Sequence, residues 1–402
     1  MGELTSQERA CIEAASAAPM LMQVEAWSAI NSGSRNLEGL RVMADQLAEA
    51  FSALPGELRM ADSAPVEAID AAGTTYDVPH GQNLHLMVRP DAPVQMLLTG
   101  HMDTVFAQDH PFQALNWVEP GKRLNGPGVA DMKGGIAVML AALKAVESSG
   151  AASVLGYEVV INSDEEVGSL GSAPLIVEAA RGKRAALTYE PSALPDGTLA
   201  GARPGSGNFS ITVHGRSAHA GRNPEEGRNA LLAAADLALR LKAAVGPSLK
   251  VNPARIDGGS PNNVVPDLAV LRVNLRPETL DDQARAQALI DSSAAAVAAE
   301  HEVQIHVHGH FARPPKPMTP EAEALFKLVR QAGADLGQPI GWKSTGGVCD
   351  GNNIAACGVP VVDTMGVRGG SIHSMEEFLI VDSLAERAAL SALTILRLAE
   401  GA

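Results

Sequence analysis

The 402-residue sequence contains few aromatic residues and few cysteines. Phe, Trp and Tyr together make up 3% of the residues, so alanine and aliphatic side chains must fill most of the interior. The three cysteines, Cys11, Cys349 and Cys357, are an odd number at wide spacing. This pattern indicates reduced thiols rather than a disulfide scaffold.

Basic residues are also scarce. Lys plus Arg number 31 against 46 Asp plus Glu, which gives a net charge of -15. This balance argues against nucleic acid or an anionic membrane as a partner, because both need a basic surface. No apolar run has the length of a membrane span, and the first residues, MGELTSQERACIEAA, are too polar for a secretory signal. We therefore expect a cytoplasmic protein.

The length and the order of the predicted elements indicate the architecture. A chain of this length exceeds one typical hydrophobic core, so we expect two domains. Strand-like segments at 84–88, 94–99 and 157–162 alternate with helical segments such as 134–150. This alternation predicts an α/β fold with a mixed, mainly parallel sheet and helices on both faces.

The pattern changes between residues 204 and 312. In LAVLRVNLR, residues 268–276, every second residue is apolar, which predicts a strand with one buried and one exposed face. Helical segments at 223–245 and 280–301 complete a small α+β insert, and the prolines of ARPPKPMTP end it. We predict a main domain formed by residues 1–203 and 313–402, interrupted by an inserted domain at 204–312.

Acidic residues and histidines follow several predicted strands of the α/β layer. His101 and Asp103 follow VQMLLTG, Glu165 and Glu166 follow YEVVINSD, and Glu190 follows RAALTY. Two more candidates lie in glycine-rich turns: Asp131 and His373. Because ligands of open α/β sheets bind at the carboxyl ends of the strands, we expect these side chains to converge.

Each of these residues also has an ordinary structural explanation. A single acid at a strand end is usually a helix cap, and Asp131 alone would suit that role. Adjacent glutamates usually form a solvated face, and a lone histidine usually makes hydrogen bonds in the core or at the surface. The joint placement favours a site, since unrelated accidents would not put five such groups at the ends of the same class of element.

The residue types suit a pair of metal ions. Zinc takes imidazole and carboxylate ligands, and two ions a few ångströms apart need a bridging carboxylate with terminal ligands on each side. The two imidazoles and three carboxylates available are those of His101, Asp131, Glu166, Glu190 and His373. We expect two Zn²⁺ ions, although Co²⁺ or Mn²⁺ also fits such ligands.

The two remaining acids have supporting roles in this interpretation. Asp103 is placed to accept the second ring N–H of His101 and so to fix the tautomer of the imidazole. Glu165 is adjacent to a ligand but points to the opposite side of an extended backbone. A carboxylate beside the metals but not on them has the position of a general base.

Eight motifs carry a resemblance to a known family. They run in order from about residue 97 to 378: GHMDTVF, NGPGVADMKGG, SDEEVGSLGS, YEPS, GRSAHAG, NVVPDLAVLRVNLR, TGGVCDGNNIAACGVPVV and IHSMEEF. In this order and spacing they resemble the M20 family of metallopeptidases, most closely its carboxypeptidase G2 (glutamate carboxypeptidase) branch.

The resemblance implies that residues 1–203 and 313–402 form a catalytic zinc-hydrolase domain with a fold like that of the zinc exopeptidases. It also implies roles for the residues of this domain. His101 and Glu190 would hold one zinc, His373 and Glu166 would hold the other, and Asp131 would bridge both. Glu165 would be the base and proton shuttle. The resemblance further implies a cis peptide bond between Asp131 and Met132.

The resemblance also implies that the insert is a lid through which two chains form a homodimer. His219, in the SAHAG segment, would reach the partner subunit's active site and stabilise the oxyanion; without the resemblance it reads as a surface-turn histidine. Asn263 and Arg276 match positions that bind the C-terminal carboxylate of the substrate, and a guanidinium suits a carboxylate. Without the resemblance, Arg276 reads as an exposed strand arginine. Arg313 is a further candidate for the same carboxylate.

One feature limits the resemblance. Between Glu190 and Arg203 the chain has no lysine or arginine, whereas glutamate-selective relatives have a basic residue there for a side-chain carboxylate. The resemblance therefore does not extend glutamate or folate selectivity to this chain.

His306, His308 and His310 alternate on one predicted strand. Because no carboxylates are nearby, we interpret them as a solvated sheet face rather than a second metal site.

These observations predict a dinuclear zinc-dependent amide hydrolase. It would remove a C-terminal amino acid with a free carboxylate from N-acyl amino acids or short peptides.

The alternatives among enzymes are a deacylase of the acetylornithine or succinyl-diaminopimelate type and a dipeptidase. The alternative of another class is an inactive homologue that binds acylated amino acids or mediates assembly, which the complete ligand set argues against. A dinuclear phosphoesterase would use similar ligands, but the chain has no arginine cluster and no loop with phosphate-binding spacing.

Overall fold

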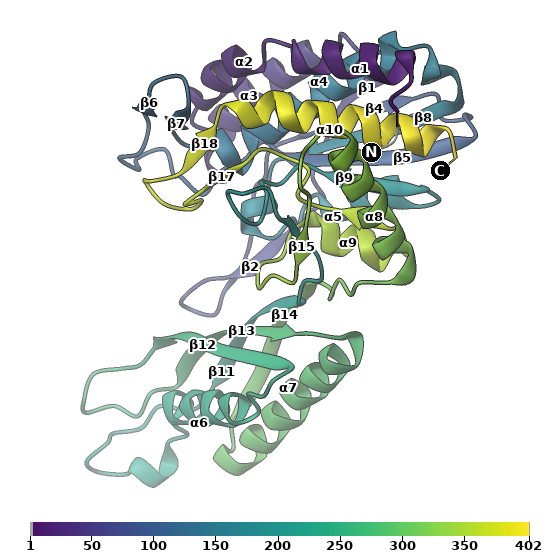
Figure 1. The fold of residues 1–402 in the computed structure, drawn as a ribbon. Helices are drawn as coiled ribbons and strands as arrows, with labels where there is room; N and C mark the ends of the chain where they lie inside the picture. The colour runs from purple at the N-terminus through teal and green to yellow at the C-terminus, as the bar shows by residue number, and fades with distance from the viewer. Residues whose placement is uncertain (1–2, 402) are drawn as a thin grey trace.

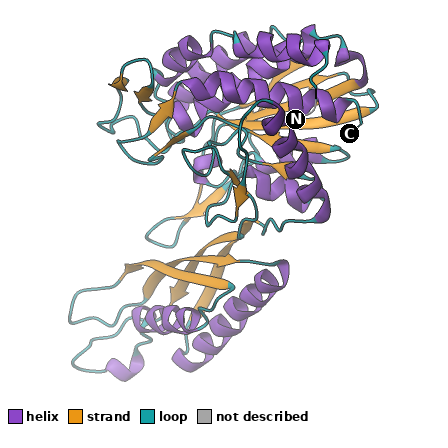
Figure 2. Cartoon of the chain, in the orientation of Figure 1, coloured by secondary structure: helices purple, strands orange, loops and turns teal. Residues whose placement is uncertain are grey.

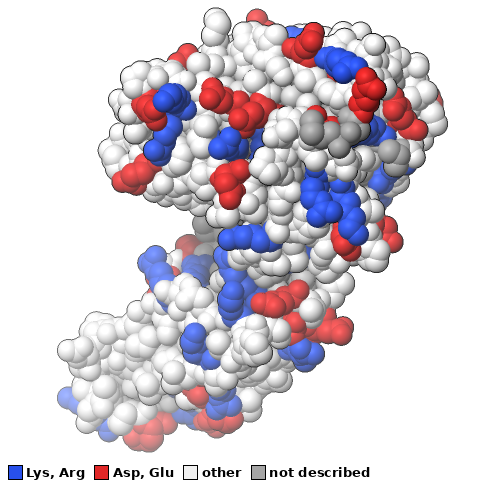
Figure 3. All heavy atoms as spheres, in the orientation of Figure 1, with Lys and Arg blue, Asp and Glu red and all other residues white. Residues whose placement is uncertain are grey.

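The computed structural model describes residues 3–401, which form two lobes (Figures 1 and 2). The larger lobe contains both ends of the described chain, and the smaller lobe is built from the middle of the sequence (Figure 1). Acidic and basic side chains are interspersed over both lobes on the face shown in Figure 3. No helix among the described residues has both the length and the apolar character needed to cross a lipid bilayer.

A six-stranded sheet forms the centre of the larger lobe, with the strand order β1-β4-β8-β5-β9-β16. Strands β8, β5, β9 and β16 are parallel, whereas β4 is antiparallel to both of its neighbours. This confirms the predicted mixed, mainly parallel sheet. The strands are β1 (Glu57–Ala61), β4 (Asn83–Val88), β5 (Val94–His101), β8 (Leu155–Asn162), β9 (Ala185–Thr188) and β16 (Val361–Val362).

Helices cover both faces of this sheet, as predicted (Figure 2). On one face, α4 lies between the sheet and the helices α1, α2 and α10, so nearly all of its side chains are buried. On the other face, α5 and α9 pack against Leu97, Val160 and Ala186. The helices of this lobe are α1 (Ser6–Ser16), α2 (Met20–Ser28), α3 (Leu37–Phe51), α4 (Gly134–Ser148), α5 (Ala173–Ala180), α8 (Pro320–Asp335), α9 (Asp350–Ala356) and α10 (Asp382–Ala399).

Strand β5 is apolar along its length because it is buried on both sides. Leu97 belongs to the core beneath α5 and α9, and Leu98 belongs to the core beneath α4. A strand covered on both faces reads as a continuous apolar run, which is the pattern of VQMLLTG. The strand therefore delivers its last residue, His101, to a buried edge of the sheet.

The smaller lobe is a four-stranded antiparallel sheet with two helices on one face (Figure 1). Its strand order is β12-β13-β11-β14, and Leu271, Val273 and Leu275 of β13 are buried as their alternation predicts. The elements are β11 (Ser206–His214), α6 (Ala230–Ala243), β12 (Leu249–Gly258), β13 (Leu268–Pro277), α7 (Leu280–His301) and β14 (Gln304–Arg313). These segments form a hydrophobic core separate from that of the larger lobe.

One helix of this lobe begins later than the sequence pattern predicts. The helical pattern starts near residue 223, but α6 starts at Ala230 because the Asn229 side chain accepts a hydrogen bond from the Leu232 N–H and caps the helix. Residues 224–226 form a separate 3-10 turn.

Several short strands have no clear counterpart in the sequence pattern. They form a hairpin, a pair and a four-stranded sheet: β2 (Glu67–Ile69) with β3 (Thr75–Asp77), β10 (Leu199–Ala200) with β15 (Trp342–Lys343), and β6 (Asn116–Glu119), β7 (Arg123–Asn125), β18 (Phe378–Ile380) and β17 (Gly369–Gly370). The β2–β3 hairpin contacts the smaller lobe, where Arg272 Nη2 donates to the Asp70 carbonyl at 2.9 Å. His308 Nε2 donates to the Glu67 carbonyl at 3.1 Å, so this histidine is half-buried while His306 and His310 are exposed.

A glycine in α4 fixes the helix against the end of β9. A Cβ atom added to Gly135 would overlap the carbonyl oxygen of Tyr189, the residue before Glu190. We expect Gly135→Ala to lower the free energy of unfolding by about 1–3 kcal/mol or more, because the overlapping atom belongs to the backbone. Thermal denaturation of Gly135→Ala and of Gly341→Ala, where an added Cβ meets open space, measures the difference. Equal melting temperatures for the two variants would contradict this account of the packing.

Candidate metal centre

The carboxyl ends of neighbouring strands bring distant parts of the chain together. His101 ends β5, Glu165 and Glu166 form a 3-10 turn shortly after β8, and Glu190 follows β9 by two residues. The remaining two predicted ligands come from connections: Asp131 precedes α4 and His373 follows β17. The structure thus collects all five predicted ligands at one edge of the sheet.

Asp131 lies between the two histidines. Its Oδ1 is 3.1 Å from His101 Nε2, and its Oδ2 is 3.2 Å from His373 Nε2. Glu190 Oε2 lies 3.7 Å from His101 Nε2, and Glu166 Oε2 lies 3.1 Å from His373 Nε2. The five residues therefore form two sets that share Asp131, the same grouping that the family resemblance implies. The peptide bond between Asp131 and Met132 is cis, which confirms that expectation.

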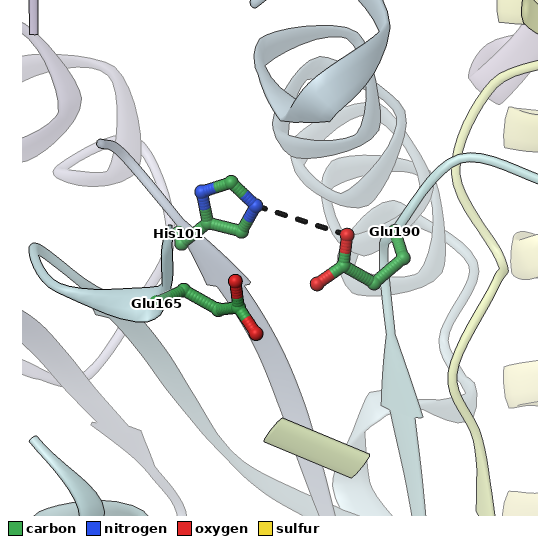
Figure 4. Close-up of side chains that lie close together, drawn as sticks. All are labelled: His101, Glu165 and Glu190. Atoms are coloured by element: carbon green, nitrogen blue, oxygen red, sulfur yellow. Dashed lines mark ion pairs between the residues drawn. The ribbon is translucent and has the colours of Figure 1, made fainter. Parts of the chain in front are cut away.

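These separations fit divalent metal ions. Two ligand atoms at 2.0–2.1 Å from one tetrahedral zinc stand roughly 3.3 Å apart, and the nitrogen-to-oxygen distances here range from 3.1 to 3.7 Å. Donor atoms of His101, Asp131 and Glu166 lie within 4.8 Å of one another, and so do those of His101, Glu165 and Glu190 (Figure 4). Glu165 thus faces the same space as the predicted ligands.

The electrostatics of the site show a deficit of positive charge. Burial raises the pKa of Glu165 and of Glu190 to about 8, and that of Glu166 to about 7, because the charged forms lose solvation. Hydrogen bonds to Asp131 and Glu166 raise the pKa of His373 to about 11. All four pKa values are therefore raised. Divalent cations bound beside these groups would lower the pKa values of the three glutamates and of His373 again, because positive charge favours the carboxylates and the neutral imidazole.

Asp103 supports the site from behind His101, although not only in the predicted way. His101 Nδ1 donates to the backbone carbonyl of Asp103 at 3.0 Å, whereas the nearer carboxylate oxygen lies 3.4 Å away. The carboxylate accepts hydrogen bonds from the Ser34 hydroxyl and from the N–H groups of Glu165 and Glu166. Asp103 therefore orients the glutamate turn as well as the histidine.

Arg313 is buried and pairs with Glu165. Its Nη2 donates to Glu165 Oε1 at 2.7 Å, and its Nη1 pairs with Asp350 and donates to Asn353 Oδ1 at 2.8 Å. Arg313 is not among the described residues that line the cavity at this site. Its contacts support a role in orienting Glu165 rather than the predicted role in binding a substrate carboxylate.

A cavity of about 490 Å³ opens beside the donor cluster. Its wall includes Asp131, Glu165, Glu166, Glu190 and His373, and it continues along the segment that follows β9. The cavity is large enough for a small amide or short peptide and places such a ligand in contact with the donors.

The three predicted residues of the smaller lobe do not line this cavity within the described chain. His219 is exposed and forms a β-bridge with Val264, next to Asn263, whose carbonyl accepts the Ala220 N–H at 3.0 Å. Arg276 reaches the larger lobe, where its Nη1 donates to the Gly346 carbonyl at 2.9 Å. The contribution of His219 to a partner's site stays a prediction.

Glu377 is a supporting residue that the sequence did not reveal. Its buried carboxylate accepts the N–H groups of Ala130 and Asp131, both at 3.0 Å, and that of Gly128 at 3.2 Å. These bonds hold the turn that presents Asp131 to both histidines. The available signal was the position of Glu377 four residues after His373 in IHSMEEF, but nothing in one sequence distinguishes it from Glu376.

Comparisons with known proteins agree in pointing to one group of hydrolases. Residues 97–397 match Peptidase family M20/M25/M40. The chain is 30% identical over 334 residues to carboxypeptidase G2 of Pseudomonas sp. (strain RS-16). The aligned region covers 80% of this chain and 78% of that protein. It is 29% identical over 340 residues to succinyl-diaminopimelate desuccinylase of Halorhodospira halophila (strain DSM 244 / SL1), covering 79% and 85%. The crystal structure of a tripeptidase from Staphylococcus aureus shares the fold, with a TM-score of 0.73 and 24% identity, over 95% of this chain and 98% of that one.

Removal of the charge of Glu377 should weaken metal binding without unfolding the protein. A glutamine has nearly the same shape but a weaker acceptor, so the turn that carries Asp131 loses part of its support. We expect Glu377→Gln to lower metal affinity on the order of 10–100-fold, as for other groups that orient a ligand. Competition with a chromogenic chelator measures the affinity, and Glu376→Gln, which alters the exposed neighbour, is the matched control. Unchanged affinity in Glu377→Gln would show that the turn holds Asp131 without this carboxylate.

Proposed function

The chain belongs to peptidase family M20/M25/M40, and from this premise we propose that it is a dinuclear zinc hydrolase of amide bonds. It removes a C-terminal amino acid with a free carboxylate from N-acyl amino acids or short peptides. The observation that supports this proposal most directly is the position of Asp131, with one carboxylate oxygen near each of two histidines. Such a shared carboxylate is the central requirement of a two-metal site.

The donors divide into the two ligand sets of the proposal. His101 and Glu190 would hold one zinc, His373 and Glu166 the other, and Asp131 would bridge them; Co²⁺ or Mn²⁺ also suits these ligands. The bound ions would supply Lewis-acid polarisation of the scissile carbonyl and lower the pKa of the attacking water.

Glu165 moves the proton in this proposal. Arg313 holds its carboxylate by Oε1, which leaves Oε2 to accept a proton from the attacking water. The same oxygen then returns the proton to the nitrogen of the departing amino acid, so that the carbon–nitrogen bond breaks with a neutral amine as the leaving group. Asp103 keeps Glu165 in place through its bond to the Glu165 N–H.

The smaller lobe binds and encloses the substrate in this proposal. Arg276, which already reaches Gly346 in the larger lobe, binds the C-terminal carboxylate together with Asn263. His219 stabilises the oxyanion in the active site of the partner subunit of a homodimer formed through this lobe. A cationic or hydrogen-bonding group at a developing oxyanion acts strongly when water is excluded.

A deacylase of the succinyl-diaminopimelate type is the second candidate, supported by the similarity to the desuccinylase from Halorhodospira halophila. Rates for acyl-amino acids, succinylated diamino acids and dipeptides separate it from the first candidate. An inactive homologue is disfavoured because the five donors and Glu165 are all present and close together.

Replacement of Glu165 tests the proton-transfer step. Glu165→Gln preserves the side-chain shape and an oxygen acceptor for Arg313, so we expect full metal content and an unchanged melting temperature. We expect kcat to fall by about 10²–10⁴-fold, the usual contribution of a general base. Steady-state hydrolysis of an N-acyl amino acid, with metal analysis of the same samples, measures both quantities. Substantial activity in the fully metallated variant would remove Glu165 from this role.

Metal titration tests the ligand sets. We expect about two equivalents of Zn²⁺ per chain, loss of hydrolysis after dialysis against a chelator, and a lower melting temperature for the apo-protein, because bound ions stabilise the folded state. His373→Ala should retain His101, Asp131 and Glu190 and therefore bind close to one equivalent. Inductively coupled plasma mass spectrometry measures the content. Full activity in chelator, or one equivalent in the unmodified protein, would contradict a two-metal site.

A further inference from the structure

The cavity beside the proposed metal centre has a largely apolar wall. The segment between Glu190 and Arg203, which contains no lysine or arginine, forms one side of it through residues that include Ala193, Pro195 and Ala200. Val348 and Phe378 line the cavity from other segments. A side chain that enters this space therefore meets carbon atoms over much of its surface.

Arg203 is the one arginine or lysine among the described residues that line this cavity, and its guanidinium is already bound. Nε donates to Asp363 Oδ2 at 2.8 Å and Nη2 donates to Asp363 Oδ1 at 3.2 Å. Nη1 lies 3.2 Å from the Gly347 carbonyl and 3.4 Å from the Thr345 hydroxyl, both of which accept hydrogen bonds. A carboxylate from a ligand would have to displace these partners from a two-pronged, buried ion pair.

A second cation, Lys316, lies close to the partner of Arg203 but does not line the cavity. Lys316 Nζ lies 3.1 Å from Asp363 Oδ2, so Asp363 is shared by two cations. Lys316 is buried and is not among the described cavity-lining residues. The cluster of Arg203, Lys316 and Asp363 thus carries an excess positive charge but offers no free pair of donors to a ligand, and a desolvated carboxylate without a partner is strongly disfavoured.

The position of Arg276 indicates which part of a substrate faces this wall. Its guanidinium binds the Gly346 carbonyl, and the flanking residues Thr345 and Gly347 line the cavity. Arg276 itself does not line the cavity. If the C-terminal carboxylate binds Arg276 and the scissile carbonyl lies at the donor cluster, as in the proposed function, the side chain of the departing amino acid would face the apolar segment.

We propose that this wall is the specificity site for the side chain of the released amino acid, and that it selects apolar side chains over acidic ones. The inference rests on the proposed amide hydrolase function and adds the class of amino acid that the enzyme releases: leucine, methionine or phenylalanine rather than glutamate. Burial of the apolar side chain drives its binding, whereas a glutamate side chain loses its hydration and finds Arg203 occupied.

The test uses the full-length, zinc-loaded protein and a series of N-acetyl amino acids. Values of kcat/KM are measured for the leucine, methionine, phenylalanine, glutamine and glutamate derivatives. Glutamine and glutamate have nearly the same size, so their ratio isolates the cost of the charge. We expect the best apolar substrate to exceed the glutamate derivative by at least about tenfold, and the glutamine derivative to lie between them.

Two variants of the wall locate the selectivity. Ala193→Lys places a cation in the cavity and should raise the ratio of glutamate to leucine hydrolysis by about tenfold or more. Ala193→Met adds a chain of similar length without charge and should leave that ratio low. Both variants keep every predicted metal ligand and Glu165, so metal content serves as a check on folding.

The outcomes separate this inference from the function on which it rests. A wild-type preference for glutamate over leucine, or an equal ratio in Ala193→Lys and Ala193→Met, overturns the specificity site while amide hydrolysis stands. Failure of the zinc-loaded protein to hydrolyse any derivative overturns the proposed function and this inference with it. An apolar preference that Ala193→Lys shifts toward glutamate supports the proposal.

Discussion

The burial of several carboxylates at one place is the constraint around which this structure is organised. Asp131, Glu165, Glu166 and Glu190 meet at one edge of a sheet, and the three glutamates have raised pKa values first because burial removes their solvation and then because other acids lie close to them. A chain keeps such a cluster only where positive charge balances it. In this chain the balance comes partly from two histidines and Arg313, and a pair of divalent cations would complete it.

A further set of buried acids holds the cluster in position through the backbone. Asp103 accepts the N–H groups of Glu165 and Glu166, and Glu377 accepts those of Ala130 and Asp131. Both acids therefore bind the backbone of a turn that carries predicted metal ligands, and the Asp103 carboxylate also lies 3.4 Å from His101 Nδ1. Because the turns are pinned at their N–H groups, the donor side chains start from fixed backbone positions, which limits the reorganisation needed when a ligand binds.

Much of the architecture and the donor set could be predicted from the sequence because both depend on local patterns. The apolar run before His101 and the run before Glu165 each identify a buried strand and the residues at its end. The supporting contacts could not be predicted in the same way. Glu377 and Asp131 are 246 residues apart, and nothing near Glu377 shows which backbone it will reach. Arg313 had the chemistry of a carboxylate binder, but its carboxylates proved to be Glu165 and Asp350 of the same chain. The later start of α6 depended on Asn229, a single capping residue within a longer helical pattern.

The end of β14 has a mechanical consequence. The chain passes between the lobes at the start of β11 and at the end of β14, and the last residue of β14 is Arg313, which holds Glu165. The smaller lobe is thus tethered directly to the side chain proposed to transfer protons. A displacement of that lobe that moved Arg313 would therefore also move the partner of the Glu165 carboxylate, so the position of the lobe and the alignment of Glu165 are mechanically linked.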